Sequence, residues 1–524
     1  LLLWQKERRS RYMRFVTDGE EMQKIDHYTI DTLGYPSIVL MERAALAFVN
    51  CLCRELSKDE RVLCVCGTGN NGGDGIAIAR ILYTKGYTSG FYLADSEEKA
   101  SQETKKELEM ARNTGVPEYN TLDLSHVRVV VDALFGTGLC REVTGAYKDM
   151  VTKINDWRKG SERGRVWAVD IPSGLHAGTG QPLGAGIQAD ATVTFGLAKR
   201  GMILYPGRDI AGKVYVEDIG FPQKAIEKNR PLAHIYETSD LNRLPVRKND
   251  SNKGSYGRLL IIAGSKDRAG AGYFAAKAAS RMGIGLVRLL TPEVNRMIYQ
   301  MMVPEAVLTS WTSESLTESM LCQALSWADT VVIGPGIGTQ KEAEKLVYWT
   351  LKNIKIPLIM DADALNLIAN HPEWLEWIPE DTVITPHMGE MARLTKSSIQ
   401  ILKIDPVGQA LEYAKRRRLI CVMKDAATVA ASPAGSVYIN TTGNHGMSAG
   451  GSGDVLAGVI GALISQGLTP WEAARLGVFI HGMAGGPGLH GMAGDRAREM
   501  KGAYSMSAND LLDGLAHVTK RMDD

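Results

Sequence analysis

Two glycine-rich segments combine backbone amides with polar side chains, as sites for phosphate-bearing ligands do. The first, GTGNNGGDG at 67–75, follows an apolar run and precedes a helix-like run. Its glycines at 67, 69 and 72 leave N–H groups open to a phosphate at a helix N-terminus. A dinucleotide fingerprint also needs an acidic residue about 20 positions later, and Asp95 lies near there. An ordinary dehydrogenase loop does not need the additional Asn70, Asn71 and Asp74.

Oxygen-bearing side chains follow two later apolar runs. Asp132 lies in VDALFGTGL, and Asp170 and Ser173 lie in VDIPSGL. An amide oxygen, a carboxylate and a hydroxyl that converge at one sheet edge form a hard site for an alkali or alkaline-earth cation. The residues alone leave a second interpretation open, in which these groups cap helix N-termini.

The second glycine-rich segment, GGSGD at 450–454, precedes an apolar helix-like run. Stacked amides at a helix start bind anions, and the carboxylate of Asp454 would project toward the group that reacts with the phosphate. A general base is needed there, because a hydroxyl is a poor nucleophile until its proton is accepted. A turn in which Asp454 only caps the helix is the alternative.

Short apolar runs that alternate with helix-length segments predict two parallel α/β sheets. The first series lies at 61–66, 91–94, 127–135, 165–171 and 191–196, and the second at 258–265, 331–338, 356–366, 381–391 and 419–428. A polar, turn-rich stretch separates them, so we expect domains at 13–230 and 231–524. Residues 1–12 are expected to be a disordered extension with Met13 as the start. Thr17 and Glu20 predict a capping box at the first helix.

Composition limits the class of protein. With 524 residues the chain exceeds one domain, and 60 Lys+Arg against 59 Asp+Glu give a net charge of +1. No global field therefore favours nucleic acid or an anionic membrane. The longest apolar run, 455–464, is too short to span a bilayer, and the odd set of seven cysteines suits a reducing compartment. We expect a soluble, cytoplasmic homo-oligomer without nucleic-acid or membrane partners.

GTGNNGGDG, VDALFGTGL and VDIPSGL, in this order and spacing, resemble the YjeF amino-terminal domain, an NAD(P)HX epimerase. The resemblance implies a Rossmann-like α/β/α fold, with Asn71, Asp132 and Ser173 as K⁺ ligands and Asp132 also as the catalytic acid/base. Asp95 stands where some members have a lysine, so the second acid/base group is unassigned. The implied substrate contacts are Asn70, Asn71, Gly72, Gly73, Asp74, Gly136, Thr137, Gly138, Leu139, Cys140, Arg141 and Asp170.

Six segments of the second half resemble the ribokinase-like, ADP/ATP-dependent NAD(P)HX dehydratase. They are NKGSYG (252–257), IGPGIG (333–338), MDADALN (360–366), TPHMGEM (385–391), MKDAAT (423–428) and NTTGNHGMSAGGSGD (440–454). The resemblance implies a ribokinase-like α/β/α fold, Mg²⁺ with ADP or ATP, and Asp454 as the catalytic base. Ala271, Gly336 and His387 would contact the hydrated substrate. The implied nucleotide contacts are Lys424, Asp425, Ala426, Ala427, Thr428, Gly450, Gly451, Ser452 and Gly453, with Asp425 replacing the family's usual glycine.

Both halves predict one repair pathway for hydrated nicotinamide dinucleotides. The first domain would act as an isomerase on the R and S epimers of NAD(P)HX, and the second as a lyase that dehydrates the S form with hydrolysis of ADP or ATP. A small-molecule kinase of the ribokinase superfamily, fused to a non-catalytic nucleotide-binding domain, is the alternative. The repeated HGMAG at 481–485 and 490–494 has no assigned role.

Overall fold

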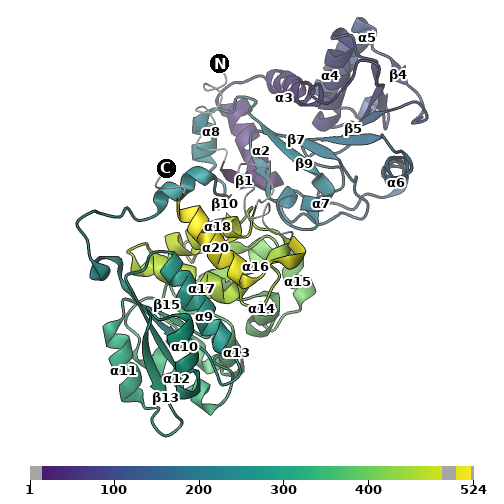
Figure 1. Ribbon diagram of the computed structural model, residues 1–524. Coiled ribbons are helices and arrows are strands. Elements are labelled where there is room, and N and C mark those ends of the chain that lie inside the picture. Colours follow the sequence, from purple (N-terminus) through teal and green to yellow (C-terminus); the bar gives the residue numbers. More distant parts are fainter. Residues whose placement is uncertain (1–13, 487–502, 521–524) are drawn as a thin grey trace. The chain divides into compact units, whose positions relative to one another are not determined.

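The computed structural model describes residues 14–486 and 503–520 (Figure 1). The chain divides into two compact units, Leu1–His234 and Ile235–Asp524, and each is described by itself. The proposed extension at 1–12 and the second HGMAG copy at 490–494 lie outside the described residues.

The first unit is built on a seven-stranded parallel sheet in the order β4-β3-β2-β5-β6-β7-β9. Residues alternate between two apolar clusters along its central strands: Val62, Cys64 and Cys66 join one, and Leu63 and Val65 join the other. This alternation buries both faces, because a parallel sheet is covered by helices on each side. The strands are β2 (Val62–Cys66), β3 (Ser89–Leu93), β4 (Glu118–Tyr119), β5 (Val129–Ala133), β6 (Arg165–Val169), β7 (Ala191–Phe195) and β9 (Lys213–Glu217).

Helices cover the two faces of this sheet. Side chains of α3 (Ser37–Leu52), α4 (Asn70–Thr84) and α5 (Gln102–Thr114) pack in one cluster, and those of α6 (Gly145–Gly160) pack in the other. The α/β/α arrangement confirms the expected fold class. Smaller elements are β1 (Phe15–Thr17), α2 (Gly19–His27), the π-helical η1 (Tyr28–Thr32), β8 (Ala198–Lys199), η3 (Arg200–Met202), α7 (Gly207–Ala211), α8 (Gln223–Lys228) and β10 (Ala233–His234).

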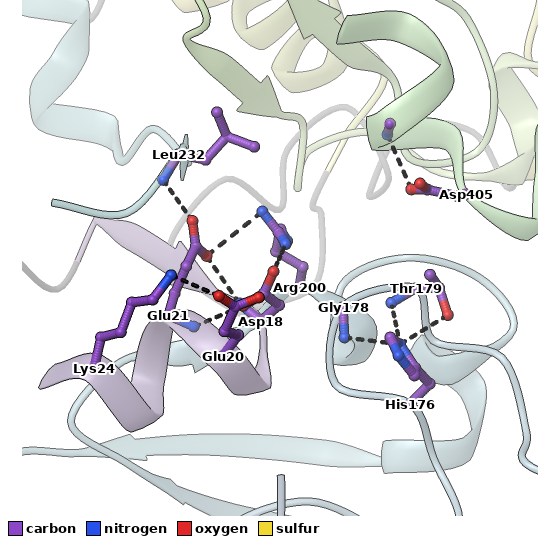
Figure 2. A network of polar contacts seen from close by, with 11 residues as sticks. Asp18, Glu20, Glu21, Lys24, His176, Gly178, Thr179, Arg200, Leu232 and Asp405 are labelled. Atoms are coloured by element: carbon purple, nitrogen blue, oxygen red, sulfur yellow. Dashed lines mark hydrogen bonds and ion pairs between the residues drawn. The ribbon is translucent and has the colours of Figure 1, made fainter. Parts of the chain in front are cut away.

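Helix α2 is anchored by a polar network at its start (Figure 2). Asp18 accepts a hydrogen bond from the Glu21 amide at 2.8 Å, and Glu21 accepts one from the Asp18 amide at 3.0 Å. Arg200 forms ion pairs with both carboxylates. The predicted capping box at Thr17 and Glu20 is therefore wrong by one residue, because Thr17 belongs to β1, where it pairs with Lys199 of β8.

The second unit contains nine strands in the order β13-β12-β11-β14-β15-β16-β17-β18-β19. The strands are parallel as far as β17, and β18 and β19 continue the sheet in antiparallel pairs. The predicted parallel α/β series is thus confirmed. The strands are β11 (Arg258–Ile262), β12 (Leu286–Pro292), β13 (Val307–Trp311), β14 (Thr330–Ile333), β15 (Leu358–Met360), β16 (Val383–Ile384), β17 (Ile420–Met423), β18 (Val429–Ala431) and β19 (Val437–Ile439).

Helix α17 (Ser452–Ser465) lies in the main apolar core of this unit with α9 (Ala269–Arg281), α18 (Pro470–Ala484) and α20 (Ala508–Lys520). Residues 455–464 are all buried, which explains why this helix is apolar around its whole circumference. Within the described ranges, no helix has the length and apolar character required to cross a membrane. The other helices are α10 (Arg296–Met302), α11 (Glu318–Trp327), α12 (Lys341–Asn353), α13 (Asp363–Asn370), α14 (Met388–Thr395), α15 (Ile399–Ile404) and α16 (Pro406–Arg417).

Candidate active sites

The first candidate site lies at the carboxyl ends of β2, β5 and β6, which are neighbours in the sheet. The glycine-rich turn packs tightly there: a Cβ on Gly67 would lie 2.0 Å from the Leu134 carbonyl oxygen, and one on Gly72 would lie 1.8 Å from the Gly67 oxygen. By contrast, a Cβ on Gly69, the residue before α4, would meet open space. Two of the fingerprint glycines therefore serve close packing, and the third leaves the helix N-terminus accessible.

Asp132 and Ser173 meet directly at this edge. The Ser173 hydroxyl donates to Oδ1 of Asp132 at 2.6 Å, and the Ser173 amide donates to Oδ2 at 2.8 Å. Asp132 is completely buried, which raises the pKa of its carboxyl to about 6, although the hydrogen bonds from Ser173 oppose the rise. A buried carboxylate held this way can position a ligand or a cation.

Asn71, the third proposed cation ligand, lies beside the loop after β5. A Cβ on Gly136 would be 3.3 Å from Oδ1 of Asn71, so the amide packs against this loop. The side-chain nitrogen of Asn71 is buried and has no hydrogen-bond partner in the described part of the chain. Buried polar atoms are normally satisfied, so the unpaired amide marks a place where a ligand would bind.

The proposed substrate contacts occupy three segments around this edge. Asn70, Asn71, Gly72, Gly73 and Asp74 form the first residues of α4, and Asp170 follows β6. The loop after β5 carries Gly136, Thr137, Gly138, Leu139, Cys140 and Arg141, of which Gly138, Cys140 and Arg141 are exposed. The loop rests on α2, because a Cβ on Gly19 would lie 2.3 Å from the Thr137 oxygen and one on Gly138 would lie 3.1 Å from Nε2 of Gln23.

A buried lysine joins this site, and the sequence motifs did not identify it. Lys199 is 1% exposed and its ammonium forms an ion pair with Asp170; it also donates to Thr194 and to the Phe195 carbonyl. Asp170 itself adopts φ 65°, a strained conformation for a residue other than glycine. The only sequence signal was a lysine soon after an apolar run, in TFGLAK.

Two more carboxyls belong to this cluster. Burial raises the pKa of Asp26, on α2, to about 7, and Lys199 and Asp170 also act on it. Burial raises the pKa of Asp74 well above its usual range, with further increases from Asp170, Glu107 and Asp26. Asp95, in contrast, is bound to Lys99 and to the Ser96 amide, which lower its pKa.

The second candidate site lies where β15, β16 and β17 end. Lys424, after β17, donates to Oδ1 of Asp361 at 2.7 Å, and Thr385 donates to the same oxygen at 2.7 Å. A Cβ on Gly453 would lie 3.1 Å from Nζ of Lys424. The predicted lysine and the predicted glycine loop therefore meet. Asp361, which lies in the segment MDADALN but was not among the predicted site residues, binds this lysine.

Asp454 lies in the first turn of α17, a helix that begins directly after Gly451, whose φ is 92°. Burial raises the pKa of Asp454 to about 7; Asp361 raises it further and Lys424 lowers it. Ser452 contacts Nε2 of His481 at 3.3 Å, and burial lowers the pKa of this histidine to about 4. Asp454 is therefore a carboxyl that can exchange a proton near neutral pH, beside a helix N-terminus and a lysine.

The proposed substrate contacts of this unit form two groups. A Cβ on Gly336, whose φ is 62°, would lie 2.8 Å from the Cβ of Ala271, so these two residues are neighbours. His387 accepts a hydrogen bond from the Gly389 amide at 2.9 Å and pairs as a β-bridge with Lys424. Burial, followed by the charge of Lys424, lowers the pKa of His387.

The loop after Lys424 is more open than its neighbours. Asp425 and Ala426 are exposed, Ala427 is buried, and Thr428 donates to the Asp425 carbonyl at 3.2 Å. Asp425 is not among the residues with positive φ, so its backbone does not require the glycine usual in the family. Nearby carboxyls that the prediction did not single out are Asp363, which accepts from the Gly338 amide and Arg268, and Glu390, which contacts His387.

Comparison with known proteins gives a family match in each half of the chain. The family described as YjeF-related protein N-terminus matches residues 37–201, and the family described as NAD(P)H-hydrate dehydratase matches residues 259–516.

In the portion of the chain described by the structure, no group of three or more His, Cys, Asp or Glu residues could hold a metal ion.

Similar proteins extend over nearly the whole chain. The bifunctional NAD(P)H-hydrate repair enzyme Nnr of Thermofilum pendens is 37% identical over 517 residues, covering 96% of this chain and 95% of its own. The enzyme of the same name from Escherichia coli is 35% identical over 503 residues, covering 95% and 93%. A crystal structure of the ADP/ATP-dependent NAD(P)H-hydrate dehydratase from Bacillus subtilis with ATP/Mg²⁺ is 27% identical, covers 55% of this chain and 98% of that chain, and has a TM-score of 0.46.

Proposed function

Because this chain belongs to the family of bifunctional NAD(P)H-hydrate repair enzymes, we propose that it repairs hydrated NADH and NADPH at two sites. The first unit interconverts the R and S epimers of NAD(P)HX, and the second dehydrates the S epimer with hydrolysis of ADP or ATP. The position of Asp454, in the first turn of α17 and under the charges of Lys424 and Asp361, carries the proposal most strongly.

In the second unit, Asp454 acts as the general base. It accepts the proton of the ring hydroxyl as that oxygen attacks the terminal phosphoryl group of the nucleotide, whose P–O bond to the leaving nucleotide breaks. Phosphate then leaves with the electrons of the C6–O bond, and loss of a proton from the adjacent ring carbon restores the double bond. The amides of Gly450–Gly453 and the ammonium of Lys424 stabilise the phosphoryl charge.

A bound nucleotide would carry Mg²⁺, which would supply positive charge to its phosphates. Asp361, Asp363 and Glu390 are carboxyls of this unit whose charges raise the pKa of Asp454. Lys424, Asp425, Ala426, Ala427 and Thr428 line the phosphate end, whereas Ala271, Gly336 and His387 contact the hydrated ring.

In the first unit, Asn70–Asp74, Gly136–Arg141 and Asp170 hold the hydrated dinucleotide, and Asp132 takes part in proton transfer at the hydrated carbon. Asn71, Asp132 and Ser173 would hold K⁺, which supplies a fixed positive charge beside the substrate. The donor set fits this ion in one respect: a single carboxylate among neutral oxygen donors balances a monovalent charge. The unpartnered side-chain nitrogen of Asn71 is a hydrogen-bond donor, so it suits an acceptor atom of the substrate.

The domain bounds, the assembly, the location and the partners of this chain are also part of the proposal. We propose that domains at 13–230 and 231–524 act as a homo-oligomer in the cytoplasm, without nucleic-acid or membrane partners. The near-zero net charge supports the absence of an electrostatic attraction to either surface.

The decisive experiment incubates the full-length protein with mixed NADHX epimers, Mg²⁺ and either ADP or ATP, and follows the absorbance of regenerated NADH. Full conversion with one inorganic phosphate per NADH is the expected result. A plateau at the starting share of the S epimer would contradict epimerisation. A stable phosphorylated product, without inorganic phosphate, would contradict dehydration and favour a kinase.

A further inference from the structure

Helix α2 places an acidic side chain at the edge of the first site, although no motif contains it. The proposed substrate loop rests on this helix at Gly19 and Gln23. Asp26 lies three residues after Gln23, and residues three apart share one face of a helix. Asp26 therefore belongs to the helix face that carries the substrate loop.

The carboxyl of Asp26 is partly accessible and is not committed to another group. It is only partly buried, and within the described residues no hydrogen bond engages its oxygens. Charged groups act on it from three elements: Lys199 of β8, Asp170 after β6 and Asp74 of α4. A free carboxyl beside several charges at a ligand edge is typical of a functional group.

The charges of the cluster divide the roles of its members. Among the described groups that act on Asp26, Lys199 is the cation, and it is bonded to Asp170, so that pair is neutral overall. Burial raises the pKa of Asp74 well above its usual range, which favours its neutral form. Asp26, whose burial raises its pKa to about 7, is the member that both gains and loses a proton near neutral pH.

Asp132 cannot supply both proton transfers of an epimerisation. Its side chain is 0% exposed, and both its oxygens already accept hydrogen bonds from Ser173. Inversion of a hydroxyl-bearing carbon removes the group from one face of the ring and adds it to the other. A second proton-transfer group is therefore needed.

We propose that Asp26 is the second acid/base group of the epimerase site, and that Lys199 is a positioning residue that holds Asp170 beside it. This inference rests on the proposed epimerase function of the first unit.

The step is balanced without an added reactant. Protonated Asp26 gives its proton to the C6 hydroxyl, the C6–O bond breaks with its electrons on the departing water, and the ring nitrogen lone pair forms a C=N bond. Water then adds to the opposite face, the C=N electrons return to nitrogen, and the added water gives one proton to Asp132, the other proposed acid/base group of the site. The site regains one proton for each one donated.

The test compares Asp26→Asn and Asp26→Glu in the full-length protein with Glu20→Gln as the matched control. Glu20 is on the same helix, but its side chain is 76% exposed and it pairs with Lys24. Epimerisation of purified S-NADHX is measured without nucleotide by chiral separation, together with kcat, KM and the pH profile.

Asp26→Asn should lower kcat by about 10²- to 10⁴-fold, with KM within about threefold of wild type, and should remove the limb of the profile near pH 7. Asp26→Glu should recover part of the rate and restore a limb, which a purely structural role would not. Glu20→Gln should match wild type. A kcat of Asp26→Asn within about threefold of wild type, or a defect confined to KM, would overturn the assignment. If the wild-type protein itself does not interconvert the epimers, the proposed function fails instead.

Discussion

Both units contain a lysine bonded to an aspartate at their sheet edge, but they expose opposite members of the pair. In the first unit Lys199 is 1% exposed and Asp170 is 16% exposed, whereas in the second Lys424 is 19% exposed and Asp361 is 1% exposed. Positive φ at a non-glycine residue occurs at both pairs: in the first unit at Asp170 itself (65°), and in the second at Ala362 (49°), which follows Asp361. The same kind of Lys–Asp pair therefore exposes its carboxylate in the first unit and its ammonium in the second.

The more exposed member of each Lys–Asp pair suits the group that the proposed ligand presents to it. An accessible ammonium attracts the phosphoryl oxygens of a nucleotide, which the second reaction requires. An accessible carboxylate instead suits proton transfer and hydrogen bonding at a hydroxyl-bearing ring. Asp26 and Asp454 are the equivalent carboxyls of the two sites. Burial raises the pKa of each to about 7, and the charges of the neighbouring Lys–Asp pair act on each.

The largest effect is expected from Asp454→Asn. Nucleotide-dependent recovery of NADH should fall by about 10²- to 10⁴-fold, because the amide cannot accept the hydroxyl proton. Epimerisation, measured separately by chiral chromatography without nucleotide, should stay at the wild-type rate. Loss of both activities would break the comparison of two independent sites.

Replacement of the buried Lys199 is expected to destabilise the first unit and not the second. Lys199→Met leaves Asp170 without its counter-ion, so the free energy of unfolding of the first unit should fall by roughly 3 to 5 kcal/mol. Hydrogen exchange followed by mass spectrometry reports the two units separately, and the second should be unchanged. Lys24→Met, at a 57% exposed surface pair, is the matched control. Equal protection in both variants would disprove the role of the buried pair.

The partly exposed Lys424 of the second unit predicts a shift in pH dependence. A general base acts when ionised, so dehydration should increase with pH through the pKa of Asp454, about 7. Because Lys424 lowers that pKa, Lys424→Met should move the limb to higher pH and should also raise the KM for the nucleotide. The pH profile of kcat/KM for both proteins tests this. A limb that moves to lower pH would contradict the proposed contact.

The proposed K⁺ site predicts a difference between cations. Asn71→Ala should raise the K⁺ concentration needed for half-maximal epimerisation by about tenfold, since one oxygen donor is lost. The measurement titrates K⁺ into protein prepared in a tetramethylammonium buffer. An epimerase rate independent of K⁺ in the wild-type protein would remove this ion from the proposal.

The smallest effect is expected at Asp425. Its side chain is exposed and its φ is not positive, so Asp425→Gly should change the KM for ATP by less than about threefold. Steady-state kinetics of dehydration at saturating S-NADHX measure this. A tenfold decrease in KM would mean that the carboxylate repels the phosphates.

Local patterns were sufficient for much of the fold. Alternation of apolar runs with helix-length segments located β2, β5, β6, β14 and β17, and the motifs located the loops after them, since a loop motif and its strand are adjacent in sequence. No predicted run covers the strands β4, β9, β12, β13, β18 and β19. The capping box was placed one residue early, because pairing of Thr17 with β8 decides where α2 begins.

The sequence by itself determined the two α/β units, the positions of both glycine-rich turns and the family to which the chain belongs. Only the tertiary structure decided that Lys199 bonds Asp170 beside Asp26, and that Lys424 bonds Asp361 beside Asp454. These partners come from different strands and helices. Their exposure and proton affinity depend on burial among distant residues, which no local pattern encodes.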